Sequence, residues 1–209
     1  KDFLQLSSPK NKVKRADAYM RLADYYYITK KNDAAIKNYR EAYELKSGNE
    51  DQALFYMALA HGFNSKGTDD KIKNLQDIVN NYPRSQYLMA SVYEIGISFR
   101  SKEQDDKALP YFQQLVKDYP TSTLVPDASI NIADIYFKRK EFAKAEDLYQ
   151  KIVKDYGTDL SICSNAVKGL SAIYKAQKQL EKLEGLSVYN CSDDIVDDLE
   201  DSYYNAAFD

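Results

Sequence analysis

Apolar residues recur at helical spacing in pairs of short segments along most of this chain. In one such pair, Ile132, Ala133 and Tyr136 form a first stripe, which ends at the charged turn 138–141. A second stripe with the i, i+3, i+4, i+7 spacing of an amphipathic helix follows at Ala145, Leu148, Tyr149, Ile152 and Val153. Because the turn between the stripes is short, the two helices are predicted to be antiparallel neighbours.

The same two-helix pattern returns about every 37 residues. Tyr82, Tyr119 and Tyr156 each close one copy and lie 37 residues apart. Equivalent positions early in the second helices are Ala35, Lys71, Ala108 and Ala145, at spacings of 36, 37 and 37 residues. A period of this length predicts a stack of similar helix pairs instead of one globular core.

These residues resemble the tetratricopeptide repeat, whose pattern is a large residue, Leu-Gly/Ala, Tyr, and then Ala, an aromatic residue, Ala and Pro. The matching positions are Tyr19, Leu22-Ala23, Tyr26, Ala35, Tyr39 and Ala42 in the first copy, Ile95-Gly96, Phe99, Ala108, Phe112 and Pro120 in the third, and Ile132-Ala133, Tyr136, Phe142, Ala145 and Tyr149 in the fourth. In the second copy Leu59-Ala60 aligns with Leu-Gly/Ala, Lys71 replaces the small alanine, and the turn is predicted to be one residue shorter. The resemblance implies an all-α, right-handed α-solenoid of antiparallel helix pairs, with ten or eleven helices and no β-sheet.

The repeats predict that 1–209 is a single solenoid fragment. Its predicted parts are the end of an upstream repeat at 1–15, repeats at 16–51, 52–88, 89–125 and 126–162, a degenerate repeat at 163–199, and the start of a further repeat at 200–209. We therefore expect the chain to be excised from a longer array. The acidic segment 193–209 carries seven acids and no base. The alternative to excision is a natural cap, for which the six acids of 193–201 would provide a polar terminal helix.

Composition excludes several classes of function. The 209 residues carry 29 basic and 32 acidic side chains, which are too evenly balanced for a nucleic-acid partner. No apolar run approaches the roughly 20 residues of a membrane-spanning segment. One histidine and two cysteines are too few for a multi-histidine or structural zinc site, so neither a metal nor a cofactor is predicted. No catalytic motif occurs, and paired acids such as Asp69-Asp70 mark helix starts, so the chain is predicted not to be an enzyme.

Cys163 and Cys191 lie 28 residues apart, outside any CxxC or zinc-binding spacing. We favour two unpaired, buried cysteines that pack as small apolar residues. A disulfide between them is the alternative.

The resemblance also implies a function, because the first helices of this family line a groove that binds a protein or peptide partner. The groove positions carried onto this chain give a candidate site of Tyr27, Met57, His61, Tyr93, Ile97, Arg100, Asp134 and Phe137. His61 is expected to pack or to contact the partner, not to act as an acid or base. The predicted partner is an apolar or amphipathic peptide, with Arg100 orienting an acidic group on it. The oligomeric state stays open.

The unit length near 37 residues and the closing phrase Tyr-Pro-x-Ser resemble repeat domains of Gram-negative envelope proteins, namely the Tol-Pal-associated periplasmic proteins and the β-barrel assembly lipoprotein. This resemblance implies a periplasmic or outer-membrane-associated protein, with the cytoplasm as the alternative. It also leaves open a second function, binding of glycan or peptidoglycan, although the chain has no tryptophan for sugar stacking.

Overall fold

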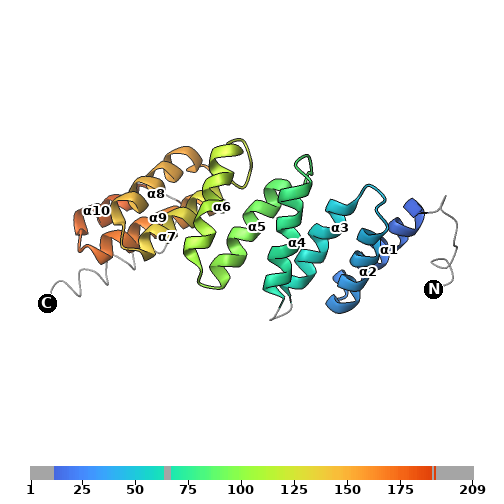
Figure 1. Cartoon of the computed structure of the whole chain (residues 1–209). Coiled ribbons are helices and arrows are strands. Elements are labelled where there is room, and N and C mark those ends of the chain that lie inside the picture. Colours follow the sequence, from blue (N-terminus) through green and yellow to red (C-terminus); the bar gives the residue numbers. More distant parts are fainter. Residues whose placement is uncertain (1–11, 64–66, 190, 192–209) are drawn as a thin grey trace. The chain divides into compact units, whose positions relative to one another are not determined.

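The computed structural model describes residues 12–63, 67–189 and 191, which form helices joined by short turns, with no β-strand among them. Figure 1 shows the order of the helices along the chain. The described helices are α1 (Lys12–Ile28), α2 (Asn32–Glu44), α3 (Glu50–Gly62), α4 (Thr68–Asn81), α5 (Leu88–Ser101), α6 (Asp105–Asp118), α7 (Val125–Lys138), α8 (Phe142–Tyr156), α9 (Leu160–Ala176), α10 (Leu180–Gly185) and the 3-10 helix η3 (Leu186–Val188). The predicted all-α solenoid of antiparallel helix pairs is therefore confirmed.

Three sequence predictions concern residues outside the described part of the chain. They are residues 1–11 of the expected upstream remnant, the start of a further repeat at 200–209, and the cap expected in the acidic segment 193–209.

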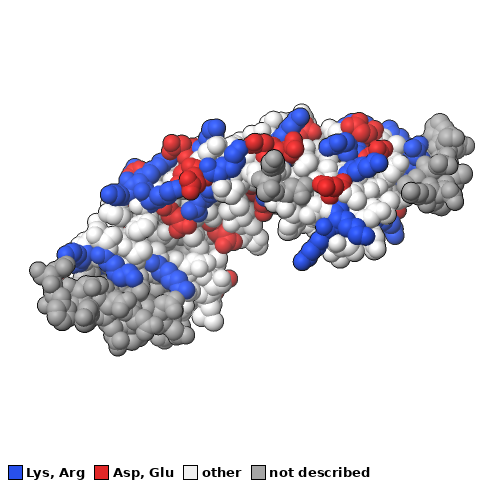
Figure 2. Space-filling view, turned by 90° about the horizontal axis from the view of Figure 1, so that it is seen from below, with Lys and Arg blue, Asp and Glu red and all other residues white. Residues whose placement is uncertain are grey.

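The chain divides into two compact units, and the division falls inside α6. Unit 1 contains the residues up to Tyr111, and unit 2 contains those from Phe112 onward. Within unit 1 each helix from α1 to α5 packs against the next one, and within unit 2 α7, α8 and α9 do the same. On the face shown in Figure 2, basic and acidic side chains are interspersed, with no large area of one sign among the residues described.

Small residues let the helices of each pair approach closely. Ala23 of α1 and Ala35 of α2 are fully buried, and so is the large Tyr39 beside them. The Tyr39 hydroxyl donates a hydrogen bond to Asp24 Oδ1 at 2.7 Å, which satisfies the polar end of a buried ring. The signature alanines and aromatic residues thus form the core that the sequence pattern predicted.

The register predicted for the second repeat is wrong by two residues. In α7 the buried residues are Val125, Pro126, Ala128, Asn131, Ile132, Ala133 and Ile135, and in α3 they are Ala53, Leu54, Met57, Ala58, Ala60 and His61. Four buried positions of α3, namely Ala53, Met57, Ala58 and Ala60, coincide with buried positions of α7 when Met57-Ala58 is aligned with Ile132-Ala133. The helix ends agree with this alignment, because α7 ends five residues after Ala133 and α3 ends four residues after Ala58 but only two after Ala60. The two pairs look alike in sequence because α3 is apolar on nearly every side, so its periodicity does not identify the inner face.

The corrected register also reverses the prediction for the turn of this repeat. Ala23 and Ala35, like Ala133 and Ala145, are 12 residues apart, whereas Ala58 and Lys71 are 13 apart. The chain between these two equivalent positions is therefore one residue longer than in the other repeats, not one shorter.

Lys71 occupies the position of the small signature alanine, and its charge is paired within the chain. Its Nζ donates to Glu94 Oε2 of α5 at 2.7 Å. Its aliphatic stem runs past Gly62 of α3, where an added Cβ would lie 3.3 Å from Lys71 Cδ. The missing side chain at Gly62 provides the room for the lysine.

The two cysteines form a disulfide, so the favoured prediction of unpaired cysteines is wrong. Cys163 Sγ of α9 is bonded to Cys191 Sγ, and the two Cα atoms are 5.9 Å apart. Leu183 of α10 and Leu186 of η3 are buried against α9, which brings the following chain back toward Cys163. A spacing of 28 residues carries no sign of this reversal of direction.

Candidate partner-binding surfaces

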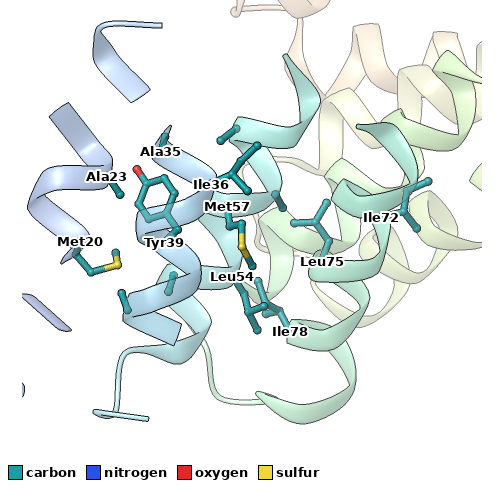
Figure 3. Packing of buried hydrophobic residues seen from close by; sticks show 14 of the residues in the cluster. Met20, Ala23, Ala35, Ile36, Tyr39, Leu54, Met57, Ile72, Leu75 and Ile78 are labelled. Carbon is teal, nitrogen blue, oxygen red and sulfur yellow. The ribbon is translucent and has the colours of Figure 1, made fainter. Parts of the chain in front are cut away.

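Met57 and His61, two of the eight predicted groove residues, lie on the inner side of α3. Their exposed fractions are 5% and 9%. Both face the space between α2 and α4, and Figure 3 shows Met57 between Ile36 of α2 and Leu75 of α4. This placement follows from the corrected register, which puts Met57 in the Leu-Gly/Ala pair and His61 at the signature tyrosine position.

Tyr27, Tyr93 and Ile97 are half-buried residues of the first helices in unit 1. The Tyr27 and Phe63 rings form an edge-to-face contact, with 5.7 Å between centroids. Burial, followed by the nearby Glu94 carboxylate, raises the pKa of Tyr27 above its ordinary value. Tyr93 and Ile97 are four residues apart on α5 and so share one face of that helix.

Arg100, Asp134 and Phe137 each make contacts within the chain. Arg100 Nε is 3.9 Å from Asp105 Oδ1 at the start of α6. In unit 2 Asp134 accepts a hydrogen bond from the buried Tyr149 hydroxyl, and the Phe137 ring lies 5.6 Å from the Phe142 ring. Their role in binding a partner stays a prediction.

Sequence reasoning missed the outward face of α3. With the corrected register this face carries Phe55, Leu59 and, at its end, Phe63, which are spaced four residues apart. Phe63 is 67% exposed, and the Phe55 ring stacks on Tyr87 with 4.8 Å between centroids. We use the name first-helix face for the set Tyr27, Phe55, Leu59, Phe63, Tyr93 and Ile97.

A crevice lies on the other side of α3. It has a volume of about 570 Å³ and is formed by α2, α3 and α4. Its lining residues are Arg40, Tyr43, Glu44, Leu54, Met57, His61, Asp70, Lys73, Asn74, Gln76, Asp77 and Asn80. We refer to this hollow as the α2–α4 crevice. Its floor is apolar at Leu54 and Met57, and its rim is charged.

The electrostatics of the α2–α4 crevice centre on His61. Its Nδ1 atom is 3.9 Å from Asp70 Oδ2. Burial lowers the pKa of His61 below the ordinary value, and the positive charge of Arg40 lowers it further, while Asp70 acts in the opposite direction. The imidazole is therefore neutral at physiological pH.

Unit 2 has a crevice at the corresponding place, between α6 and α8 over α7. Its volume is smaller, about 380 Å³. Tyr136 and Lys144 line it at the positions that His61 and Asp70 hold in unit 1. The two crevices therefore lie at equivalent junctions between successive repeats and are lined by different side chains.

In the described residues, no group of three histidine, cysteine, aspartate or glutamate side chains is placed to hold a metal ion. Within the same part of the chain, no helix has the length and apolar character required to cross a membrane.

Three family models described as tetratricopeptide repeat match this chain, at residues 16–49, 52–85 and 93–159. No curated protein matches it in sequence. A tetratricopeptide repeat protein of known structure from Parabacteroides merdae is similar to it, with a TM-score of 0.73 at 11% identity, covering 90% of this chain and 72% of that one. The MamA protein is also similar, with a TM-score of 0.60 at 19% identity, covering 84% of this chain and 95% of that one. At these identities the likeness concerns the fold.

Proposed function

Because the chain is built of tetratricopeptide repeats, we propose that it is a protein-interaction module that binds a partner peptide on its first-helix face and catalyses no reaction. Repeats of this kind generally mediate contacts between proteins. Their stacked helices present extended surfaces, and a peptide can lie along such a surface without a closed pocket.

The exposure of Phe63 carries this proposal. An aromatic side chain that is 67% exposed contributes little to the core, yet its ring meets the half-buried ring of Tyr27. Large aromatic side chains at the centre of an apolar surface are typical anchors of protein interfaces. Phe55 and Leu59 extend the same apolar surface along α3.

The spacing of the apolar side chains on α3 also supports a partner segment with apolar anchors. Phe55, Leu59 and Phe63 are separated by four residues, which matches the repeat of apolar side chains on one face of an amphipathic helix. A helical or extended segment with apolar anchors fits this surface better than a charged peptide tail does.

We also propose a location outside the reducing cytosol, with the periplasm as the expected compartment. The disulfide between Cys163 and Cys191 supports this location, since such bonds persist in oxidising compartments. Thiol labelling in intact cells tests it, because a protein in an oxidising compartment takes up label only after reduction. Labelling without reductant would contradict the proposed compartment.

Selection from a displayed peptide library tests the proposed function. The full chain serves as bait, with the exposed Phe63→Glu variant as the counter-bait and Lys37→Glu, an exposed change on α2, as the matched control. We expect apolar peptides that bind the wild-type chain and the Lys37→Glu variant but not Phe63→Glu. Peptides that bind all three proteins equally would contradict a site on the first-helix face.

A further inference from the structure

The second-helix side of the repeats carries a recurring pair of side chains. In three repeats a lysine early in the second helix lies over the aromatic residue at the signature tyrosine position of the first helix. The distances from Nζ to the ring centroid are 5.8 Å for Lys107 and Phe99, 5.2 Å for Lys144 and Tyr136, and 5.2 Å for Lys182 and Tyr174. Each lysine follows its aromatic residue by eight positions. The pair therefore repeats with the fold and closes the junction with a cation–π contact.

A glutamine from the preceding repeat completes this arrangement where the ring is a tyrosine. Gln113 Nε2 donates to the Tyr136 hydroxyl at 3.4 Å, and Gln150 Nε2 donates to the Tyr174 hydroxyl at 3.3 Å. Side chains of this chain alone thus hold the ring at these junctions.

The repeat formed by α3 and α4 departs from this arrangement at all three positions. His61 replaces the aromatic ring, Asp70 replaces the lysine, and Arg40 of α2 replaces the glutamine. Asp70 follows His61 by nine positions instead of eight, because the chain between the equivalent positions is one residue longer in this repeat. The imidazole is smaller than a phenol ring and has no lysine above it.

The replacement leaves a larger hollow. The α2–α4 crevice measures about 570 Å³, against about 380 Å³ for the equivalent crevice beside Tyr136. Leu54 and Met57 provide an apolar floor, and a methionine sulfur packs favourably against an aromatic ring. Three carboxylates line the rim, namely Glu44, Asp70 and Asp77, against two cations, Arg40 and Lys73. The Asp70 side chain is 65% exposed and is open to approach from solvent.

From this comparison we propose that the α2–α4 crevice is a second interaction site, which receives an aromatic side chain of a partner protein next to a lysine or arginine. The partner's ring lies on Met57 and Leu54 beside His61, in the place that Tyr136 fills in its own repeat. The partner's cation faces Asp70, where three of the other repeats carry their own lysine. The partner thus supplies the ring and the cation that the repeat of α3 and α4 lacks.

This site is independent of the proposed function on the first-helix face. Phe55, Leu59 and Phe63 lie on the outward side of α3, whereas Met57 and His61 line the crevice. Loss of binding at one surface therefore says nothing about the other.

Nuclear magnetic resonance of the full chain tests the proposal, because the chain offers few reporters of each kind. It contains three methionines and one histidine, so the Met57 methyl group and the His61 ring give assignable signals. The probes are three blocked tetrapeptides: Gly-Tyr-Lys-Gly, Gly-Tyr-Glu-Gly and Gly-Ala-Lys-Gly. We expect saturable shifts of Met57 and His61 with the Tyr-Lys peptide, binding about threefold to fivefold weaker with Tyr-Glu, as for an exposed ion pair, and none with Ala-Lys.

Two variants make the test specific. Asp70→Lys should reverse the preference, so that Tyr-Glu binds more tightly than Tyr-Lys, while the charge-matched Asp155→Lys on the exposed surface of α8 should leave it unchanged. A combined His61→Tyr and Asp70→Lys variant restores the arrangement of the other repeats and should lose the Met57 response to every peptide. The absence of saturation at Met57 up to about 10 mM Tyr-Lys peptide would overturn the proposal, as would equal affinity for Tyr-Lys and Tyr-Glu in the wild-type chain.

Discussion

A Cβ atom added at Gly169 of α9 would lie 2.3 Å from Cζ of Tyr149 on α8. Tyr149 is buried, and its hydroxyl donates a hydrogen bond to Asp134 of α7. The glycine therefore provides the room for a ring that joins three helices of unit 2. The sequence alignment of the repeats identified Tyr149 but gave no reason to single out Gly169.

We expect Gly169→Ala to destabilise the protein. A Cβ atom does not come this close to a carbon atom to which it is not bonded, so either the ring or the helix must shift, at a cost of roughly 1–3 kcal/mol in the free energy of unfolding. Gly185→Ala is the matched control, since an added Cβ there meets nothing within 4 Å. Urea unfolding of both variants measures the difference. Equal stability of Gly169→Ala and the wild type would contradict the packing described for Tyr149.

The corrected register of α3 gives a second prediction. Ala58 is fully buried and takes the small position of the repeat, so Ala58→Leu should overpack the contact between helices and cost roughly 1–3 kcal/mol. Leu59→Ala changes a half-buried residue on the outward face and should cost less. If Leu59→Ala proved the more damaging change in thermal unfolding, the register first predicted from the sequence would be the right one.

The regular repeats made most of the fold predictable, and the failures have local physical causes. Ala35, Tyr39, Ala145 and Tyr149 were identified as core because small and large residues alternate at fixed intervals, which only close helix packing explains. The register of α3 failed because an almost uniformly apolar helix has no polar face to orient it. As a result, Met57 was predicted on the binding surface.

The candidate site was less predictable than the core. Positions carried over from a family show which face a residue occupies only when the register is right. They also carry no information on contacts made within the chain, such as that between Arg100 and Asp105. The disulfide could not be predicted because the return of the chain after η3 depends on burial of Leu183 and Leu186, not on cysteine spacing.

The lowered pKa of His61 predicts that acidification destabilises unit 1. Burial is the main cause; Arg40 of α2 lowers the pKa further, while Asp70 of α4 and Asp33 of α2 raise it. Below the ordinary histidine pKa of about 6.5, the unfolded chain binds a proton that the folded chain does not. The stabilisation from neutral His61 is therefore present above that pH and is lost as the pH falls toward the folded-state pKa.

A comparison of unfolding free energies at about pH 7.5 and pH 5.5 checks this sign. His61→Phe, which copies the residue that α5 carries at Phe99, should lose less stability on acidification than the wild type does. If the two proteins lost the same amount of stability, the environment described for His61 would be wrong.

Reduction of the disulfide should also lower stability. The bond closes a loop of 28 residues, and removing such a constraint on the unfolded chain costs about 2–4 kcal/mol. Thermal unfolding with and without reductant measures the effect. A double Cys163→Ala, Cys191→Ala variant serves as the control, because its unfolding should not respond to reductant.

The central claim is that the first-helix face binds a protein partner. Calorimetric titration tests it most directly, with a selected peptide added to the wild type, to Phe63→Ala and to Lys37→Ala. Phe63 is largely exposed, so its replacement should leave the fold intact. We expect Phe63→Ala to weaken binding by more than about fivefold, as the loss of an interface anchor does, and Lys37→Ala to leave the affinity unchanged. An affinity of Phe63→Ala equal to that of the wild type would contradict the claim.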